Sequence, residues 1–303
     1  MKHSLSSLAA VGQKPMAALN SIADLAGQEQ QDPQQDPQQA KNAIEAAMFE
    51  RLEKNYPDLV KEYFDLPESS NGRILNTDVA RELSPDYRAD RTKSADVHEP
   101  SSAFIKKIYA DRLEHDTPKG LNNEIVFTAG GTGAGKTTAL NASKNISDQV
   151  KKAEMIYDTN MNKLESSDKK IQQALKAGRN VSIMYTYRDP VEALTQGALS
   201  RASRMEKELG TGRTVPIDEH LKTHIGARKT VEQLINKYAD NDKVKIHVID
   251  NSRGRGKAAL SSIDKLPQLN EHEVRGKLHE ALESERASGR ISDAIYRGTK
   301  GNR

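Results

Sequence analysis

A stretch of eight residues near the middle of the chain has the spacing of a phosphate-binding loop. Residues 130–137 read Gly-Gly-Thr-Gly-Ala-Gly-Lys-Thr and satisfy the pattern G-x-x-x-x-G-K-[ST] in full. Such glycines let the backbone curl around an anion, the lysine reaches the β and γ phosphate oxygens, and the last hydroxyl holds Mg²⁺. The predicted nucleotide-binding residues are Gly130, Gly131, Thr132, Gly133, Ala134, Gly135, Lys136, Thr137 and Thr138.

The segments on either side of this loop fit the same chemistry. Glu124–Thr128 is short, apolar and β-branched, as is typical of a buried parallel strand. Thr137–Val150 carries an apolar stripe and is predicted to be a helix. A strand, a glycine loop and a helix direct backbone N–H groups at one phosphate. We therefore predict ATP or GTP binding with Mg²⁺, Lys136 as a catalytic group and Thr137 as the metal ligand; a glycine turn with a structural role is the alternative.

Acidic residues follow several of the predicted strands. They are Asp78, Asp158, Asp189 and Asp250, and Arg188 precedes one of them. Active sites of parallel α/β sheets lie at the carboxyl ends of the strands. Any one of these carboxylates could instead cap a helix, but four at one edge predict at least one catalytic member.

Positive charge for a phosphoryl-transfer transition state is available further along the chain. Arg201 and Arg204 are three residues apart and share one face of a predicted helix. Arg213 lies in the glycine-bracketed segment 210–214, which is predicted to close as a lid. Ordinary solvation of an arginine-rich face is the alternative. No run of four apolar residues followed by Asp-Glu is present, which favours small P-loop kinases over motor ATPases.

Strands and helices alternate from residue 72 onward. The predicted strands are Arg73–Asn76, Glu124–Thr128, Glu154–Asp158, Asn180–Tyr187 and Val244–Asp250. The predicted helices are Val79–Leu83, Pro100–Leu113, Thr137–Val150, Ser167–Ala177, Pro190–Leu209, Asp218–Tyr238 and Asn270–Ala287. This order predicts an α/β fold, a P-loop kinase-like parallel sheet of about five strands with helices on both faces.

Composition divides the chain into four parts. Residues 1–40 form a Gln/Pro-rich tail that we expect to be disordered. Residues 41–71 are predicted to be a helical extension, 72–265 the kinase-like domain, and 266–303 a C-terminal helix with a basic tail. No cysteine is present, so thiolate chemistry is excluded. No apolar run approaches the roughly 20 residues of a membrane helix, and we expect a cytoplasmic protein without a membrane partner.

The motifs resemble those of the zeta-toxin family of P-loop kinases. Residues 129–138 are similar to the family's phosphate-binding loop, and 76–87 contain its element D-x-x-R-x-x-x-P-x-Y. Residues 98–102, His-Glu-Pro-Ser-Ser, resemble its T-H-x-E-A-S stretch, and 157–160, Tyr-Asp-Thr-Asn, resemble its E-G-T turn with Asp in place of Glu. The resemblance spans about residues 72–252.

The resemblance implies a role for each matching residue. Asp78 matches the general base that acts on the substrate hydroxyl. Glu99, Asp158 and Asn160 match substrate-binding positions, and Arg201 and Arg213 match in spacing two arginines that contact ATP phosphates. One departure stands out, because Asp78 and Glu99 precede the loop here and follow it in the usual order of the family. The sequence thus resembles a circular permutation, which preserves the site if the order of the strands in the sheet is preserved.

The activity implied is ATP-dependent phosphorylation of a hydroxyl on a small acceptor, typically UDP-N-acetylglucosamine in zeta-like enzymes. An antitoxin or chaperone partner is plausible for such an activity, and export as an effector stays open. One alternative is another acceptor, either NAD or the 5′-hydroxyl of a polynucleotide. The polynucleotide needs a basic, aromatic-lined channel, which four Phe, no Trp and a net charge of +3 supply poorly. A non-catalytic nucleotide-binding effector module is the remaining alternative.

Overall fold

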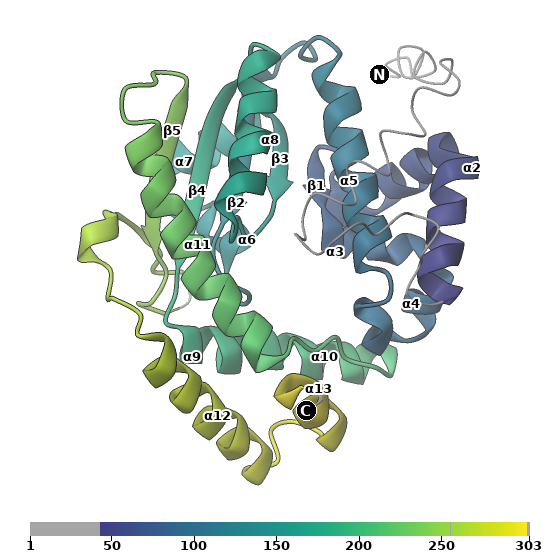
Figure 1. The fold of residues 1–303 in the computed structure, drawn as a ribbon, viewed down its shortest axis with the longest axis vertical. Helices are drawn as coiled ribbons and strands as arrows, with labels where there is room; N and C mark the ends of the chain where they lie inside the picture. The colour runs from purple at the N-terminus through teal and green to yellow at the C-terminus, as the bar shows by residue number, and fades with distance from the viewer. Residues whose placement is uncertain (1–42, 255, 302–303) are drawn as a thin grey trace. The chain divides into compact units, whose positions relative to one another are not determined.

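The structure is a computed structural model that describes residues 43–254 and 256–301 (Figure 1). The predicted tail 1–40 lies outside the described residues. The chain divides into two compact units, and of the described residues the first holds 43–89 and 93–112 and the second holds 90–92 and 113–301. Residues 72–89 and 93–112 belong to the same unit as the helix that precedes them.

The first unit is built on a long kinked helix. Helix α2, Ala43–Asp65, lies within the predicted helical extension and bends at Asn55, where φ is −129° and ψ is 27°. The bend follows from Pro57, which has no N–H to donate and whose ring clashes with the preceding turn. The unit continues with β1 (Ile74–Asn76), α3 (Thr77–Ala80), α4 (Pro85–Ala89) and α5 (His98–Leu113).

The second unit contains a mostly parallel sheet. Its strands are β2 (Asn122–Ala129), β3 (Ala153–Asp158), β4 (Asn180–Tyr187), β5 (Val244–Asp250) and β6 (Ala259–Ser261), in the order β3-β2-β4-β5-β6. The first four are parallel to their neighbours, and β6 runs antiparallel to β5. This arrangement confirms the predicted α/β kinase-like fold. The short strand β6 was not predicted, because three residues carry no readable alternation.

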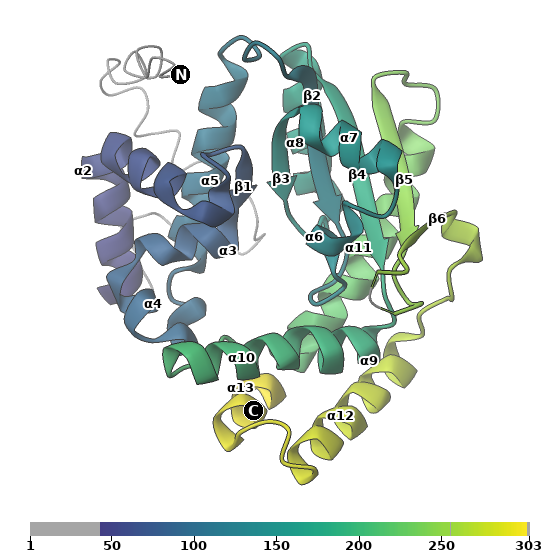
Figure 2. The same ribbon diagram turned by 180° about the vertical axis from the view of Figure 1, so that it is seen from behind.

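Helices cover both faces of this sheet. Helices α8 (Leu164–Lys176) and α11 (Ile217–Lys237) lie on one face (Figure 1), and α7 (Lys144–Lys152) lies on the other (Figure 2). Strand β4 is buried from Val181 to Tyr187, as expected for a strand covered on both sides. The parallel order brings the carboxyl ends of β2, β3, β4 and β5 to one edge.

The single helix predicted over Thr137–Val150 is wrong. The chain forms a one-turn helix α6 (Lys136–Ala139), leaves helical geometry, and restarts as α7. The restart is caused by Ser143, whose Oγ accepts a hydrogen bond of 3.2 Å from the N–H of Ile146. Serine is among the best helix N-caps, because its side chain satisfies an amide that the helix leaves unpaired.

The basic tail predicted at the end of the chain folds as a helix instead. Helix α12 (Glu271–Ala287) is followed by α13 (Asp293–Lys300). Ile295 and Tyr296 of α13 are buried in a cluster with Leu278 and Leu282 of α12 and with residues of the helices after β4 and of α11. Two of its charges are paired, Lys300 Nζ with Glu283 Oε1 at 3.2 Å and Asp293 Oδ1 with Arg286 Nε at 3.1 Å. Apolar side chains between the basic ones therefore decide the conformation.

Within residues 43–254 and 256–301, none of the helices combines the length and the apolar character needed to cross a lipid bilayer.

Candidate active site

The phosphate-binding loop leaves the carboxyl end of β2 and leads into α6. Gly133 has φ of 76°, in the left-handed region that favours glycine. A Cβ at this position would also overlap the carbonyl oxygen of Ala193. The loop therefore has both the backbone twist and the close packing that its glycine pattern predicts.

The N–H groups of the loop divide into two sets. Thr132 N donates to Thr223 Oγ1 at 3.1 Å, and Ala134 N donates to Gly131 O at 3.2 Å. Among the described residues, no hydrogen-bond partner is found for the N–H groups of Gly133, Gly135 and Thr137. The second set supplies donors that an anion such as a nucleotide phosphate needs.

Lys136 contacts two oxygen atoms beside the loop. Its Nζ lies 2.7 Å from Asn160 Oδ1 and 3.5 Å from the carbonyl oxygen of Gly130. The backbone carbonyl of Asn160 also accepts the N–H of Gly130 at 3.1 Å. Asn160, predicted as a substrate residue, thus contacts the loop lysine directly. Phosphate oxygens carry full charge and bind an ammonium group more strongly than amide oxygens do.

Asp158 ends β3 beside the loop strand. Its Oδ1 lies 2.6 Å from Thr128 Oγ1, which also accepts the N–H of Thr159 at 3.0 Å. The described residues contain no group of three or more His, Asp or Glu that could hold a metal by themselves. The exposed hydroxyl of Thr137 nevertheless fits Mg²⁺, which usually takes one or two protein ligands and completes its shell with phosphates and water.

The segment after β4 packs directly on the loop. It consists of α9 (Pro190–Glu192), a π-helix over Ala193–Leu199, and α10 (Ser200–Leu209). A Cβ at Gly197 would lie 2.5 Å from Gly133 O. The π-helix is a rare conformation that occurs often at functional sites. Here the wide turn of the π-helix places the backbone of Gly197, which has no side chain, against the loop.

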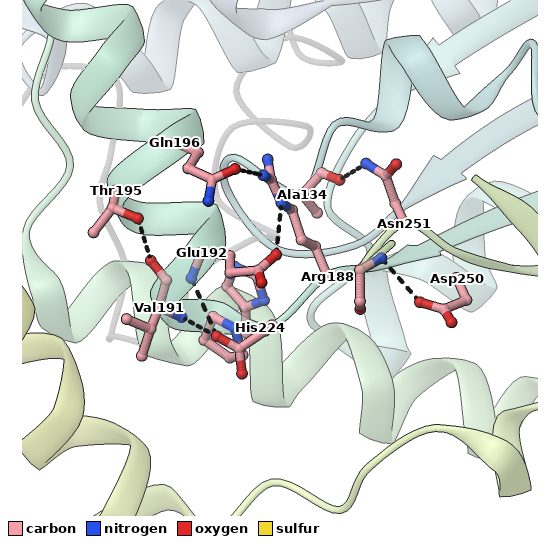
Figure 3. A network of polar contacts seen from close by, with 12 residues as sticks. Ala134, Arg188, Val191, Glu192, Thr195, Gln196, His224, Asp250 and Asn251 are labelled. Carbon is pink, nitrogen blue, oxygen red and sulfur yellow. Dashed lines mark hydrogen bonds and ion pairs between the residues drawn. The ribbon is translucent and has the colours of Figure 1, made fainter. Parts of the chain in front are cut away.

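The predicted strand-end residues of β4 support this segment. Asp189 caps α9 by accepting the N–H groups of Val191 at 2.9 Å and Glu192 at 3.1 Å. Arg188 Nη2 donates to Gln196 Oε1 at 2.6 Å, and its Nε lies 3.6 Å from Glu192 Oε2 (Figure 3). Both side chains therefore stabilise the start of the helical segment. For Asp189 this is the helix-capping role that Sequence analysis gave as the alternative to catalysis.

The two predicted phosphate-contacting arginines lie further along. Arg201 is half-buried on α10, and Arg213 is 8% exposed in the segment after α10. A Cβ at Gly212 would overlap the carbonyl oxygen of Ala202, and one at Gly298 would overlap the side chain of Thr214. The segment predicted as a lid is thus packed between α10 and α13 in this structure.

Asn251 is a further residue of the site. It follows β5, is buried, and donates from Nδ2 to the carbonyl oxygen of Ala134 at 2.8 Å (Figure 3). Its own N–H donates to Tyr187 O at 2.8 Å. The neighbouring Asp250 accepts the N–H of Ser252 at 2.9 Å and shapes the turn. The side chain of Asn251 therefore anchors the loop to the end of the sheet.

Two buried histidines on α11 complete the surroundings of the loop. His224 Nε2 lies 3.0 Å from Thr132 O, and His220 Nε2 lies 2.9 Å from Pro190 O. Burial lowers the pKa of His220 from 6.5 to about 4, although the contact with the carbonyl opposes this shift. Burial, and next the neighbouring His220, lower the pKa of His224 well below its usual value. Both rings are neutral at pH 7. Their spacing of four residues on one helix face was the available sequence signal.

The chain is similar to known proteins in part of its length. The model of one family, the zeta toxin, matches residues 144–260. The predicted resemblance to zeta toxins is confirmed. The matched segment contains Asp158, Asn160, Arg201 and Arg213 and begins after the loop.

A solved structure described under the PezAT chromosomal toxin–antitoxin system of Streptococcus pneumoniae is also similar to this chain. It covers 93% of this chain and 98% of its own, at 11% identity and a TM-score of 0.35. A likeness at this TM-score carries no argument. The search of curated proteins gives no match.

The remaining predicted zeta-toxin residues lie in the first unit. Asp78 Oδ1 is 3.0 Å from Arg81 Nη1, and Arg81 Nη2 is 2.8 Å from His98 Nδ1. His98 begins α5 and is followed by the half-buried Glu99. The buried Arg81 therefore joins the element that carries Asp78 to the element that carries Glu99. The phosphate-binding loop lies in the second unit.

Proposed function

We propose that the protein is an ATP-dependent kinase of the zeta-toxin type. It transfers the γ-phosphate of ATP to a hydroxyl of a small acceptor such as a UDP-N-acetylsugar. The observation that carries this proposal is the loop itself, with the N–H groups of Gly133, Gly135 and Thr137 free of partners among the described residues. A second argument is that the segment after β4, which leads to Arg201, packs against the loop, since a Cβ at Gly197 would lie 2.5 Å from Gly133 O.

ATP with Mg²⁺ supplies the phosphoryl group, and the residues of the chain bind and orient it. The loop N–H groups and Lys136 hold the β and γ phosphates, and the hydroxyl of Thr137 is the protein ligand of the metal. Phosphoryl transfer needs little beyond positioning and positive charge. Arg201 and Arg213 are proposed to supply that charge in the transition state.

Asp78 is proposed to accept the proton of the acceptor hydroxyl. Its side chain is 43% exposed, so a solute can reach it, and the ion pair with Arg81 orients the carboxylate. Glu99 and Asp158 are proposed to bind the acceptor. Asn160 joins them in this proposal, since its side chain contacts Lys136 and a phosphate binds that ammonium group more strongly than an amide oxygen does. Aspartate at position 158, shorter by one methylene than the family's glutamate, predicts an acceptor that differs in detail.

The proposal is tested by phosphate transfer from γ-labelled ATP and Mg²⁺ to a panel of UDP-sugars, NAD, nucleosides and 5′-hydroxyl oligonucleotides. We expect label on a UDP-sugar with the wild type and none with Lys136→Ala or Asp78→Asn. The matched controls are Lys144→Ala and Asp86→Asn, both exposed, and they should retain the activity.

Other results would separate the alternatives. Label on NAD or an oligonucleotide would support kinase activity but show that the acceptor is not a UDP-sugar. Tight ATP binding without any labelled acceptor would favour the nucleotide-binding effector module. An equal rate for Asp78→Asn and Asp86→Asn would remove Asp78 from the reaction.

A protein partner belongs to the same proposal. A kinase that consumes a nucleotide-sugar harms the cell that makes it, so an antitoxin or chaperone is expected to hold it inactive, and a cytoplasmic location follows from the substrates. Expression of the wild type and of Lys136→Ala in a host without the partner tests this. Growth arrest by the wild type only is expected, and equal growth would argue against such a partner.

A further inference from the structure

One turn of helix α11 satisfies both backbone groups of a loop residue. Thr223 Oγ1 accepts the N–H of Thr132 at 3.1 Å and donates its own proton to the carbonyl oxygen of His220 at 2.8 Å. His224 Nε2 lies 3.0 Å from the carbonyl oxygen of Thr132. Because a carbonyl oxygen only accepts, the Nε2 of His224 carries the proton and donates. Thr132 is therefore held from both sides by side chains 91 and 92 residues away in the sequence.

The ring of His224 also occupies space that the loop leaves open. A Cβ at Gly131 would overlap this ring, so the packing of α11 requires a glycine at this variable position of the pattern. The ring is 4% exposed and lies 4.6 Å, centroid to centroid, from the ring of His220. The contact is thus a close-packed surface as well as two hydrogen bonds.

The same helix turn reaches the segment that leads to the arginines. His220 Nε2 donates to the carbonyl oxygen of Pro190 at 2.9 Å, at the start of α9. The loop and the segment after β4 therefore share one support. Neither contact involves the N–H groups of Gly133, Gly135 or Thr137.

We propose that Thr223 and His224 are positioning residues of the phosphate-binding loop. They fix Thr132 so that the N–H groups of Gly133 and Gly135 are oriented before the anion arrives. A binding site that is already ordered loses less conformational entropy when its ligand binds. The proposal deepens the proposed function, since it takes nucleotide phosphate as the ligand.

The test compares paired substitutions in the full chain. Thr223→Val removes the hydroxyl at nearly constant volume, and Thr223→Ser keeps it. His224→Phe keeps a ring without a donor, and His224→Gln keeps an N–H donor. Thr230→Val is the matched control, because Thr230 is a buried threonine two helix turns further along α11.

Two properties are measured, the Kd for Mg-ATP and the hydrogen exchange of backbone amides at 130–135 without nucleotide. We expect Thr223→Val and His224→Phe to raise the Kd by roughly tenfold, as the loss of a buried hydrogen bond implies. Both should speed exchange at 130–135. Thr223→Ser and His224→Gln should stay within about threefold of the wild-type Kd, and Thr230→Val should change neither property.

The result that overturns the inference is loop exchange in Thr223→Val and His224→Phe equal to that in Thr230→Val. Failure of the proposed function gives a different pattern. In that case the wild type and Lys136→Ala show the same affinity for Mg-ATP, and the exchange measurement alone decides whether Thr223 and His224 hold the loop.

Discussion

Mild acid should destabilise the protein through His220. This ring is fully buried, and burial lowers the pKa of its imidazole from 6.5 to about 4. Above pH 6.5 the ring is neutral in both the folded and the unfolded chain, so the free energy of unfolding does not depend on it. As the pH falls through 6.5 the unfolded chain takes up a proton that the folded chain refuses until about pH 4. Stability is therefore lost across this window.

The size of the loss follows from the two pKa values. Each unit of difference corresponds to about 1.4 kcal/mol, so at pH 5 the contribution of His220 is about 2 kcal/mol less favourable than at pH 7.5. Below pH 4 the loss levels off at about 3 kcal/mol. His224 adds to the loss in the same direction, because burial and the neighbouring ring lower its pKa too.

The assay is urea unfolding at pH 7.5 and pH 5.0 for the wild type and His220→Gln. Glutamine keeps an N–H that can donate to Pro190 O and does not titrate, and the histidines other than its neighbour His224 cancel in the comparison. We expect the wild type to lose about 2 kcal/mol more than the variant between the two pH values. An equal loss in both proteins would refute the reasoning, because it would mean that His220 titrates alike in the folded and unfolded chains.

Three further predictions concern the loop and the C-terminal helices. Gly131→Ala should weaken Mg-ATP binding by more than about tenfold, because its Cβ would overlap the ring of His224. The control is Gly276→Ala, which lies in open space on α12 and should leave Mg-ATP binding unchanged. It should stabilise the helix by about 0.5–1 kcal/mol in urea unfolding. Asn251→Ala should raise the Kd for Mg-ATP by roughly tenfold through loss of a buried hydrogen bond to the loop carbonyl, and an unchanged Kd would remove it from the site. Leu282→Ala should cost about 2–5 kcal/mol of unfolding free energy, since its side chain is 1% exposed, and a cost below about 1 kcal/mol would show that α12 does not belong to the core.

The sequence predicts the loop and the strands well because each is encoded locally. The pattern over 130–137 depends on neighbouring residues alone, and strands such as Asn180–Tyr187 are rich in β-branched and aromatic residues, with bounds that the structure reproduces. Buried parallel strands carry this signal in every residue.

Features decided by competition between local signals were predicted less well. Ser143 was read as part of a helix, and it caps a new one. The charges after Glu285 suggested a solvated tail, while Ile295 and Tyr296 among them are buried and hold α13 in place. In both cases a few side chains outweighed the average character of their segment.

The support of the loop could not be predicted, because its partners are remote in the sequence. Thr223 and His224 meet Thr132 across about ninety residues, and Asn251 meets Ala134 across 117. Nothing in the local pattern of a helix or a strand exit identifies these residues as neighbours of a loop. Their roles follow only once the fold brings α11 and the end of β5 to the carboxyl edge of the sheet.

The most direct test of the central claim is phosphorus NMR of the full chain with Mg-ATP and a UDP-N-acetylsugar. The account predicts that ADP and a new phosphomonoester appear at equal rates, and that both are lost in Lys136→Ala. Release of inorganic phosphate alone, or ATP that stays intact with this and every other hydroxyl acceptor in the panel, would contradict the assignment of the protein as a kinase.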